Sequence, residues 1–333
     1  PFRCLACGGI YEFACHPNYD LDQLEPTLPG IWRYRHTFCL PENAPVVSLG
    51  EGNTPLVWSK AFEKQIAFKL EFLNPSGSFK DRGTSPLVSF LSARGVTAAV
   101  EDSSGNAGAS FAAYAAAVGI KAQIYVPAYA SGPKSAQIEA YGAHVIPVPG
   151  PRSKAAEAVE REAHEGAVYA SHAYMPHDTL GYSTIAYELF EQLGEAPGTV
   201  ISPTGQGLLL GIGIGFNALQ RTGLISHTPV LVGVQAAACA PLWTAFYQGE
   251  KAMVDPISEG ETLAEGVRAR SPLRRERVIQ LVRFSGGRFV VVDEESILPG
   301  RDQLGRRGLF VEPTSAIVWD GLSQIIGHVP EPI

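Results

Sequence analysis

The sequence predicts an α/β protein of two lobes, each a mostly parallel sheet flanked by helices, and three observations support this class. Short apolar segments with the length of strands alternate with longer segments that have the apolar content of helices. Polar, glycine-containing turns stand where a strand gives way to a helix. The length of 333 residues exceeds that of most single hydrophobic cores.

The predicted elements follow in chain order. An alternating segment at 67–72 is expected to be a strand and 84–94 a helix. Further strands are expected at 98–100, 122–126, 144–148 and 167–170, with helices at 107–118, 135–141 and 152–165. A second set of strands is expected at 199–201, 230–234 and 289–292. We expect a larger domain of residues 41–90 plus 185–333 and a smaller domain of residues 91–184.

Composition limits the classes of binding partner and the cellular compartment that we expect. The net charge of -7 argues against a protein that binds nucleic acid or an anionic membrane surface. The longest apolar stretch, 208–216, is far shorter than the roughly 20 residues that span a bilayer. Five cysteines, an odd number, do not form a disulfide framework, and no secretory signal opens the sequence. We therefore expect a cytoplasmic protein with a small-molecule partner.

Residues 1–40 resemble a degenerate zinc ribbon. Cys4 and Cys7 form one ligand pair, but the second pair is reduced to Cys15 beside His16. Structural zinc sites need four ligands, and adjacent residues rarely reach one metal ion. We expect a metal-free remnant in this segment.

The turn Asn74-Pro-Ser-Gly-Ser-Phe-Lys-Asp-Arg-Gly83 places Lys80 between a predicted strand and a predicted helix. Such corners carry chemistry in α/β folds. Most lysines are nevertheless solvated surface charges, so this turn alone leaves a solvated, a structural and a reactive lysine open.

Two further corners have the composition of anion-binding helix starts. Ser103-Ser-Gly-Asn-Ala-Gly108 precedes an alanine-rich helix, and Ser202-Pro-Thr-Gly-Gln-Gly207 precedes a glycine-rich one. Backbone N–H groups and the helix dipole favour a carboxylate or a phosphate at such positions. Simple capping would need only one of these polar residues. The glycines from Gly211 to Gly215 lie inside the predicted helix, which excludes a dinucleotide fingerprint.

One lysine, an anion-binding helix start in each lobe and no acidic metal cluster fit pyridoxal phosphate, whose aldehyde needs an amine and whose phosphate needs N–H donors. The order and spacing of the motifs then resemble the tryptophan-synthase-β-like, fold type II pyridoxal phosphate enzymes. Within that superfamily the chain is most similar to threonine synthases, over about residues 45–325. The motifs are Glu51–Leu56, Asn74–Gly83, Ser103–Gly108, Thr204–Leu208 and Glu312–Ala316.

The resemblance implies roles for individual residues. Lys80 is expected to form the Schiff base with the cofactor and to act as general base, Phe79 to flank the ring and Asn106 to face the ring hydroxyl. The substrate carboxylate is expected at Ser103, Ser104, Gly105 and Asn106. The cofactor phosphate is expected on the backbone of Thr204, Gly205, Gln206, Gly207 and Leu208. The resemblance also implies a homodimer and a lyase that converts O-phosphohomoserine and water to threonine and phosphate.

The sequence departs from the threonine synthase pattern between His172 and Thr184. Asp178 stands where an arginine is expected and His172 where an asparagine is expected. A carboxylate repels a substrate phosphate, which favours the alternative of a serine or threonine ammonia-lyase. A catalytically silent homologue is a further alternative. His172 and His177 are either substrate contacts or surface histidines. Thr314 and Ser315 are the candidate hydroxyls for the pyridine nitrogen.

Overall fold

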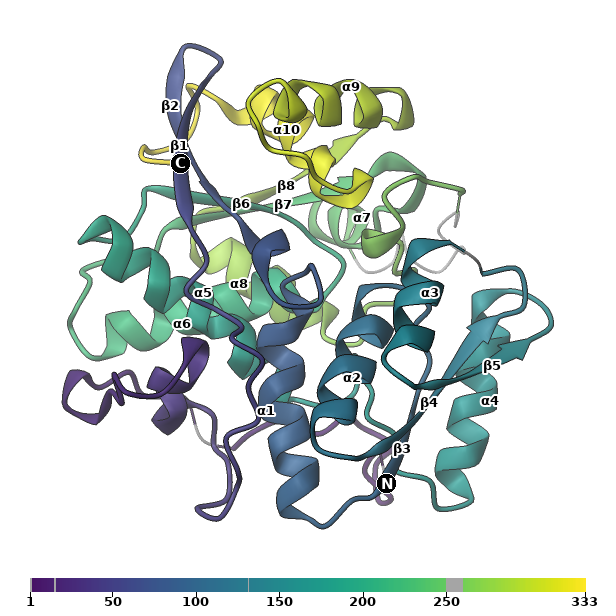
Figure 1. Ribbon diagram of the computed structural model, residues 1–333. Coiled ribbons are helices and arrows are strands. Elements are labelled where there is room, and N and C mark those ends of the chain that lie inside the picture. Colours follow the sequence, from purple (N-terminus) through teal and green to yellow (C-terminus); the bar gives the residue numbers. More distant parts are fainter. Residues whose placement is uncertain (1, 15, 131, 250–259) are drawn as a thin grey trace. The chain divides into compact units, whose positions relative to one another are not determined.

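The computed structural model describes residues 2–14, 16–130, 132–249 and 260–333 (Figure 1). The chain divides into two compact units. The first contains Pro1–Thr54 and Glu71–Thr184, and the second contains Pro55–Leu70 and Ile185–Ile333. This division differs from the predicted one, because residues 41–54 and 71–90, with Lys80, belong to the first unit.

A parallel sheet of β3 (Ala98–Glu101), β4 (Lys121–Pro127) and β5 (His144–Val148) forms the centre of the first unit. Helices α2 (Asn106–Ala117) and α3 (Pro133–Ala140) lie on one face of the sheet and α4 (Arg152–His164) lies on the other (Figure 1). The predicted strand at 167–170 is reduced to a single parallel bridge between Val100 and Tyr169. Apolar side chains of α1 (Lys80–Ala93), α2 and the strands form one core.

Polar contacts explain why the lysine turn belongs to the first unit. The Ser110 hydroxyl on α2 donates to Asp81 Oδ1 at 2.6 Å. The Tyr114 hydroxyl, also on α2, donates to Glu51 Oε2 at 2.7 Å. All four side chains are buried, so these bonds form away from water and hold α1 and the 41–54 segment to α2.

The second unit has its own parallel sheet of β6 (Thr199–Pro203), β7 (Val230–Ala236) and β8 (Arg288–Val292). Helices α6 (Gly207–Arg221) and α8 (Arg275–Phe284) lie on one face, and α10 (Pro313–Ile325) covers the other (Figure 1). Helices α7 (Pro241–Gln248) and α9 (Glu294–Gly305) complete this unit. Helix α5 (His177–Leu193) crosses from the first unit to the second.

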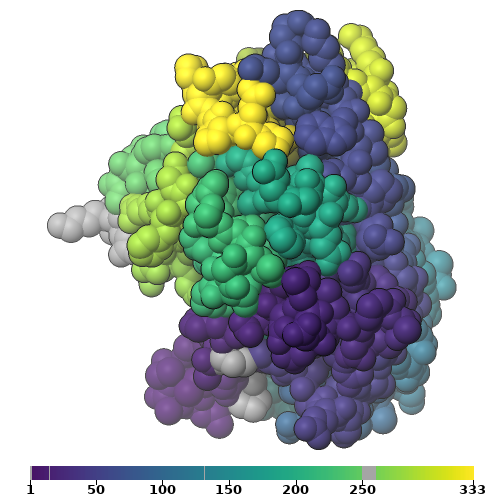
Figure 2. Space-filling model, turned by 90° about the vertical axis from the view of Figure 1, so that its left-hand side faces the viewer, coloured from purple at the N-terminus to yellow at the C-terminus, as the bar shows by residue number. Residues whose placement is uncertain are grey.

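A β-hairpin of β1 (Leu56–Ala61) and β2 (Lys64–Lys69) also belongs to the second unit. Its turn residues Phe62 and Glu63 have φ angles of 50° and 63°. The strand predicted at 67–72 begins earlier than expected, at Lys64, and ends at Lys69. Residues 71–73 form a 3₁₀ turn. The Ala67 N–H donates to the Ile333 carbonyl at 2.8 Å, and Figure 2 shows the last residues (yellow) at the surface beside the hairpin (blue).

The N-terminal segment packs into the first unit and does not form a separate domain. Trp32 is fully buried, and its Nε1–H donates to Ser85 Oγ at 2.9 Å. Phe2 makes edge contacts with the rings of Tyr169 and Tyr174. Cys15 of the suspected zinc ribbon lies outside the described residues. Among the residues that are described, no helix is long and apolar enough to cross a membrane.

One buried guanidinium binds the residues at which the chain enters or leaves the first unit. Arg82 is fully buried and donates from Nε and Nη2 to the Glu71 carboxylate at 2.7 and 2.8 Å. Nη2 also reaches the Thr54 hydroxyl at 3.1 Å, and Nη1 reaches the Thr184 hydroxyl at 3.0 Å. Thr54, Glu71 and Thr184 are the residues at which the chain leaves or enters this unit.

Candidate active site

The lysine turn is fixed by the carboxylate that follows the lysine. Asp81 accepts hydrogen bonds from the Ser76 N–H at 2.6 Å and the Ser76 hydroxyl at 2.5 Å. From α3, Lys134 Nζ and Gln137 Nε2 both donate to the Ser76 carbonyl. Burial raises the pKa of Asp81, which the hydrogen bonds from Ser110 and Ser76 offset only in part. The turn therefore presents Lys80 from a rigid support.

Two aromatic rings lie near the amine of Lys80. This lysine is the first residue of α1 and is half-buried. Its Nζ lies 5.1 Å from the centroid of the Phe79 ring and 5.8 Å from that of Tyr182. The two rings meet edge to face at 5.0 Å. Sequence analysis did not find Tyr182, because it lies on α5, far from Lys80 in the sequence.

Helices α1 and α5 approach closely through Gly83. A Cβ atom at Gly83 would lie 2.8 Å from the Cα of Asp178 and 2.8 Å from a ring carbon of Tyr182. Only glycine fits this contact. Asp178, where the resemblance expects an arginine, is therefore buried against the first turn of α1, and Tyr182 donates to its Oδ2 at 3.3 Å.

The Ser103–Gly108 turn joins the end of β3 to the start of α2. Ser104, Gly105 and Asn106 are half-buried, whereas Ser103 is buried. Within the described chain, no side chain caps the start of α2 at Gly105. A Cβ atom at Gly108 would lie 1.8 Å from the Ser103 carbonyl oxygen, so the turn can close only over glycine. The open helix start is suited to an anion.

The Thr204–Leu208 loop follows β6 in the second unit. The Thr204 N–H donates to the Val234 carbonyl at 2.8 Å, and Gln235 Nε2 donates to the Thr204 carbonyl at 3.1 Å. Gln206 precedes α6, but its side chain accepts the Leu273 N–H at 3.0 Å and, among the described residues, does not cap the helix. The N–H groups of the first turn of α6 are thus suited to bind an anion.

A family model described as "Pyridoxal-phosphate dependent enzyme" matches residues 47–332. The chain belongs to this family. The match spans the lysine turn, the Ser103–Gly108 turn and the Thr204–Leu208 loop, and it confirms the predicted cofactor, fold class and enzyme class.

Relatives and solved structures agree with this family. The chain is 32% identical to a threonine synthase of Methanocaldococcus jannaschii, over 97% of this chain and 87% of the relative. A structure of a T.th. threonine deaminase is 28% identical with a TM-score of 0.68, and the match covers 83% of this chain and 89% of that one. A structure of maize serine racemase is 26% identical with a TM-score of 0.70, covering 80% and 79%.

The residues of this pyridoxal-phosphate dependent enzyme fit the cofactor in each unit considered by itself. The first unit offers the Lys80 amine beside Phe79 and the start of α2 at Asn106. The second offers the start of α6 and Gly205, where an added Cβ would meet no described atom closer than 3.4 Å. Close by in sequence, Ser202 Oγ is buried and has no hydrogen-bond partner among the described residues. Thr314, a candidate for the pyridine nitrogen, accepts the Gly266 N–H at 3.0 Å.

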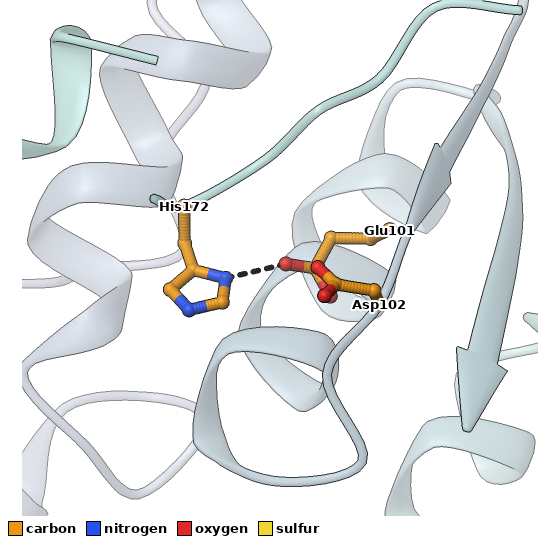
Figure 3. A group of neighbouring side chains, drawn as sticks. All are labelled: Glu101, Asp102 and His172. Carbon is orange, nitrogen blue, oxygen red and sulfur yellow. Dashed lines mark hydrogen bonds and ion pairs between the residues drawn. The ribbon is translucent and has the colours of Figure 1, made fainter. Parts of the chain in front are cut away.

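The structure adds a side-chain cluster beside the Ser103–Gly108 turn of this enzyme (Figure 3). Glu101, Asp102 and His172 place their carboxylate and imidazole atoms within 4.8 Å of one another. The sequence left His172 as a substrate contact or a surface residue, and its side chain is 17% exposed. Glu101 and Asp102 were missed, although they directly follow the predicted strand at 98–100.

His177 is buried, which excludes the alternative of a surface histidine. It is 4% exposed and lies between the rings of Phe13 and Phe90, with centroid distances of 5.1 and 4.4 Å. Its Nδ1 has no hydrogen-bond partner in the described chain. Burial lowers the pKa of His177 from 6.5 to about 4. The folded protein thus keeps this imidazole neutral.

We expect His177 to make the enzyme acid-sensitive. Because its folded pKa lies below the unfolded value, the unfolded chain binds more protons between about pH 6.5 and 4, and stability falls as the pH falls through this window. The loss is about 3 kcal/mol. Urea unfolding across this range should give a shallower pH slope for His177→Phe than for the parent. His144→Asn, at an exposed position, is the control; equal slopes for all three proteins would contradict the assignment.

Proposed function

We propose that this enzyme is a threonine synthase that converts O-phosphohomoserine and water to threonine and phosphate. The observation that carries the proposal is the likeness to the M. jannaschii threonine synthase, which extends over 97% of the chain. The threonine synthase form of the lysine motif, Ser78-Phe-Lys-Asp-Arg-Gly83, supports it.

The motif residues would have the following roles in binding the cofactor and the substrate. Lys80 would bind the cofactor aldehyde, Phe79 would flank the ring and Asn106 would donate to the ring hydroxyl. The N–H groups of Thr204, Gly205, Gln206, Gly207 and Leu208 would hold the cofactor phosphate. Ser103, Ser104, Gly105 and Asn106 would receive the substrate carboxylate. These assignments rest on the match of motifs and on the open helix starts at Asn106 and Gly207.

Bound pyridoxal phosphate supplies an electron sink that acidifies the C–H bond at the substrate Cα. The Lys80 amine would take one proton from Cα and one from Cβ before phosphate leaves from Cγ. It would return one proton to Cγ, which becomes the methyl group, and one to Cα. Water would give its hydroxyl to Cβ and its proton to the released phosphate.

A serine or threonine ammonia-lyase is the second candidate, and the placement of Asp178 favours it. This carboxylate is 2% exposed and packs against Gly83, one turn along α1 from Lys80. A negative charge near the reacting amine would disfavour a substrate that carries a phosphate. The likeness to a threonine deaminase structure agrees with this candidate.

Product analysis separates the two candidates. Purified enzyme should be incubated separately with O-phosphohomoserine, L-serine and L-threonine. Equal amounts of phosphate and threonine from O-phosphohomoserine are expected. Formation of a 2-oxo acid from serine or threonine, with no phosphate released from O-phosphohomoserine, would reject the synthase in favour of the ammonia-lyase.

The assembly and compartment are also proposals. Resemblance to fold type II enzymes supports a homodimer of the 35.6 kDa chain, which light scattering of the purified enzyme would measure. The odd number of cysteines supports a reducing cytoplasm, and fractionation of the source cells would test that location.

A further inference from the structure

The cluster of Glu101, Asp102 and His172 forms where two parallel segments end. The Val100 N–H donates to the Val168 carbonyl at 2.8 Å, and the Ala170 N–H donates to the Val100 carbonyl at 2.9 Å. β3 and the segment after α4 therefore run side by side. Glu101 and His172 are 71 positions apart in the sequence, and they meet at the carboxyl ends of these two segments. The His172 ring is directed at Glu101 (Figure 3).

Glu101 connects His172 to the proposed carboxylate-binding turn. His172 Nδ1 lies 2.5 Å from Glu101 Oε1, and the Ser103 N–H donates to Glu101 Oε2 at 2.5 Å. Asp102 Oδ1 accepts the Tyr169 hydroxyl at 2.8 Å. His172 Nδ1 and both oxygens of Glu101 already have partners in these contacts, so the geometry fits an ion pair better than a metal centre.

Burial and the contacts within the cluster shift the pKa values of its two carboxyl groups. Burial raises the pKa of Glu101, but the attraction and hydrogen bond of His172 outweigh it and leave the pKa below its ordinary value. Burial raises the pKa of Asp102, and the charge of Glu101 raises it further. The other groups that act on the pair are the Tyr169 hydroxyl and, from α4, the Arg152 guanidinium. The lowered pKa favours the carboxylate form of Glu101, which lies against the His172 ring, and the raised pKa favours the uncharged form of Asp102.

We propose that the Glu101–His172 ion pair positions the Ser103–Asn106 turn and sets its affinity for the α-carboxylate of an amino acid by keeping the adjacent charge neutral. This inference rests on the proposed role of the turn as the carboxylate site and is independent of which amino acid reacts. Neither residue touches the substrate in this scheme, because Glu101 acts through the Ser103 backbone and His172 acts through Glu101.

Removing the positive charge leaves a buried anion behind the turn. That anion repels a bound carboxylate, and at the separations within one turn the effect is roughly tenfold in affinity. Glu101→Gln avoids this repulsion, because its amide oxygen still accepts the Ser103 N–H while its amide N–H donates to a neutral imidazole.

The test uses cofactor-loaded enzyme and two ligands that have no leaving group, L-alanine and L-alaninamide. Calorimetric titration gives the ratio of their dissociation constants, which isolates the contribution of the carboxylate. His172→Asn should weaken L-alanine binding roughly tenfold, while L-alaninamide binding stays unchanged. Glu101→Gln and the double variant Glu101→Gln/His172→Asn should bind L-alanine within about threefold of the parent.

His144→Asn, an exposed histidine of β5, is the matched control and should resemble the parent. Circular dichroism and thermal unfolding check each variant, and if Glu101→Gln fails to fold, the comparison of His172→Asn with the parent decides. Equal losses for both ligands, or a double variant as weak as His172→Asn, would overturn the proposal. A parent enzyme that binds L-alanine no better than L-alaninamide would overturn it too, and this result is independent of the O-phosphohomoserine assay.

Discussion

Replacing Lys80 by alanine is expected to remove the visible absorbance of the bound cofactor and to lower the lyase rate by about 10³-fold or more. Lys80 is the first residue of α1, and its amine lies beside the rings of Phe79 and Tyr182. No shorter side chain at this position can supply both the amine for the aldehyde and the base for the substrate. Absorbance spectra and initial rates of the purified proteins measure both effects.

Lys121→Ala is the matched control, because Lys121 is an exposed lysine of the same unit, at the start of β4. It should keep the colour and rate of the parent. Reduction of the parent with borohydride followed by peptide mapping should place the cofactor on Lys80. A cofactor attached to another lysine, or a coloured Lys80→Ala protein at full activity, would contradict the assignment.

Replacing Arg82 by methionine is expected to cost about 3 kcal/mol of the free energy of unfolding. The fully buried guanidinium donates to Glu71, Thr54 and Thr184, and the Glu71 side chain is only 18% exposed. Methionine fills similar volume but leaves the Glu71 carboxylate without its counter-ion in a poorly solvated place. Urea unfolding followed by circular dichroism gives the difference.

Arg94→Met is the control that tests whether the loss of stability is specific to the buried arginine at position 82. Arg94 caps the same helix at its other end and is exposed, so its loss should change stability by no more than about 0.5 kcal/mol. If Arg82→Met were as mild as Arg94→Met, the buried network would contribute little to stability.

The sequence predicts most of the fold because its signals are local. The strands β3 to β8 and the helices between them follow from apolar segments and from the turns that bound them. The hairpin was not predicted because its turn uses Phe62 and Glu63 at positive φ, where glycine or asparagine would have given the usual signal. The segment at 167–170 has the residues of a strand but forms one bridge to β3. The extent of this pairing depends on tertiary contacts, which the local sequence does not show.

The turns that carry the proposed site residues could be predicted where a motif is contiguous. The lysine turn and the two helix starts each lie within about ten residues, and the structure forms a turn at each. Contacts between distant segments could not be predicted. Glu101 and His172, and likewise Phe79 and Tyr182, meet only because β3 and α1 pack against later parts of the chain. The two compact units divide the chain differently from the expected domains for the same reason, since Ser110 and Tyr114 bind Asp81 and Glu51 and hold them to α2.

The Arg82 network has a mechanical consequence. The backbone enters or leaves the first unit after Thr54, before Glu71 and after Thr184, and all three residues bind one guanidinium. The loss of this one side chain would therefore remove a contact at each of the three connections. That side chain stands two residues from Lys80 on the first turn of α1, so the three connections and the lysine share one buried support.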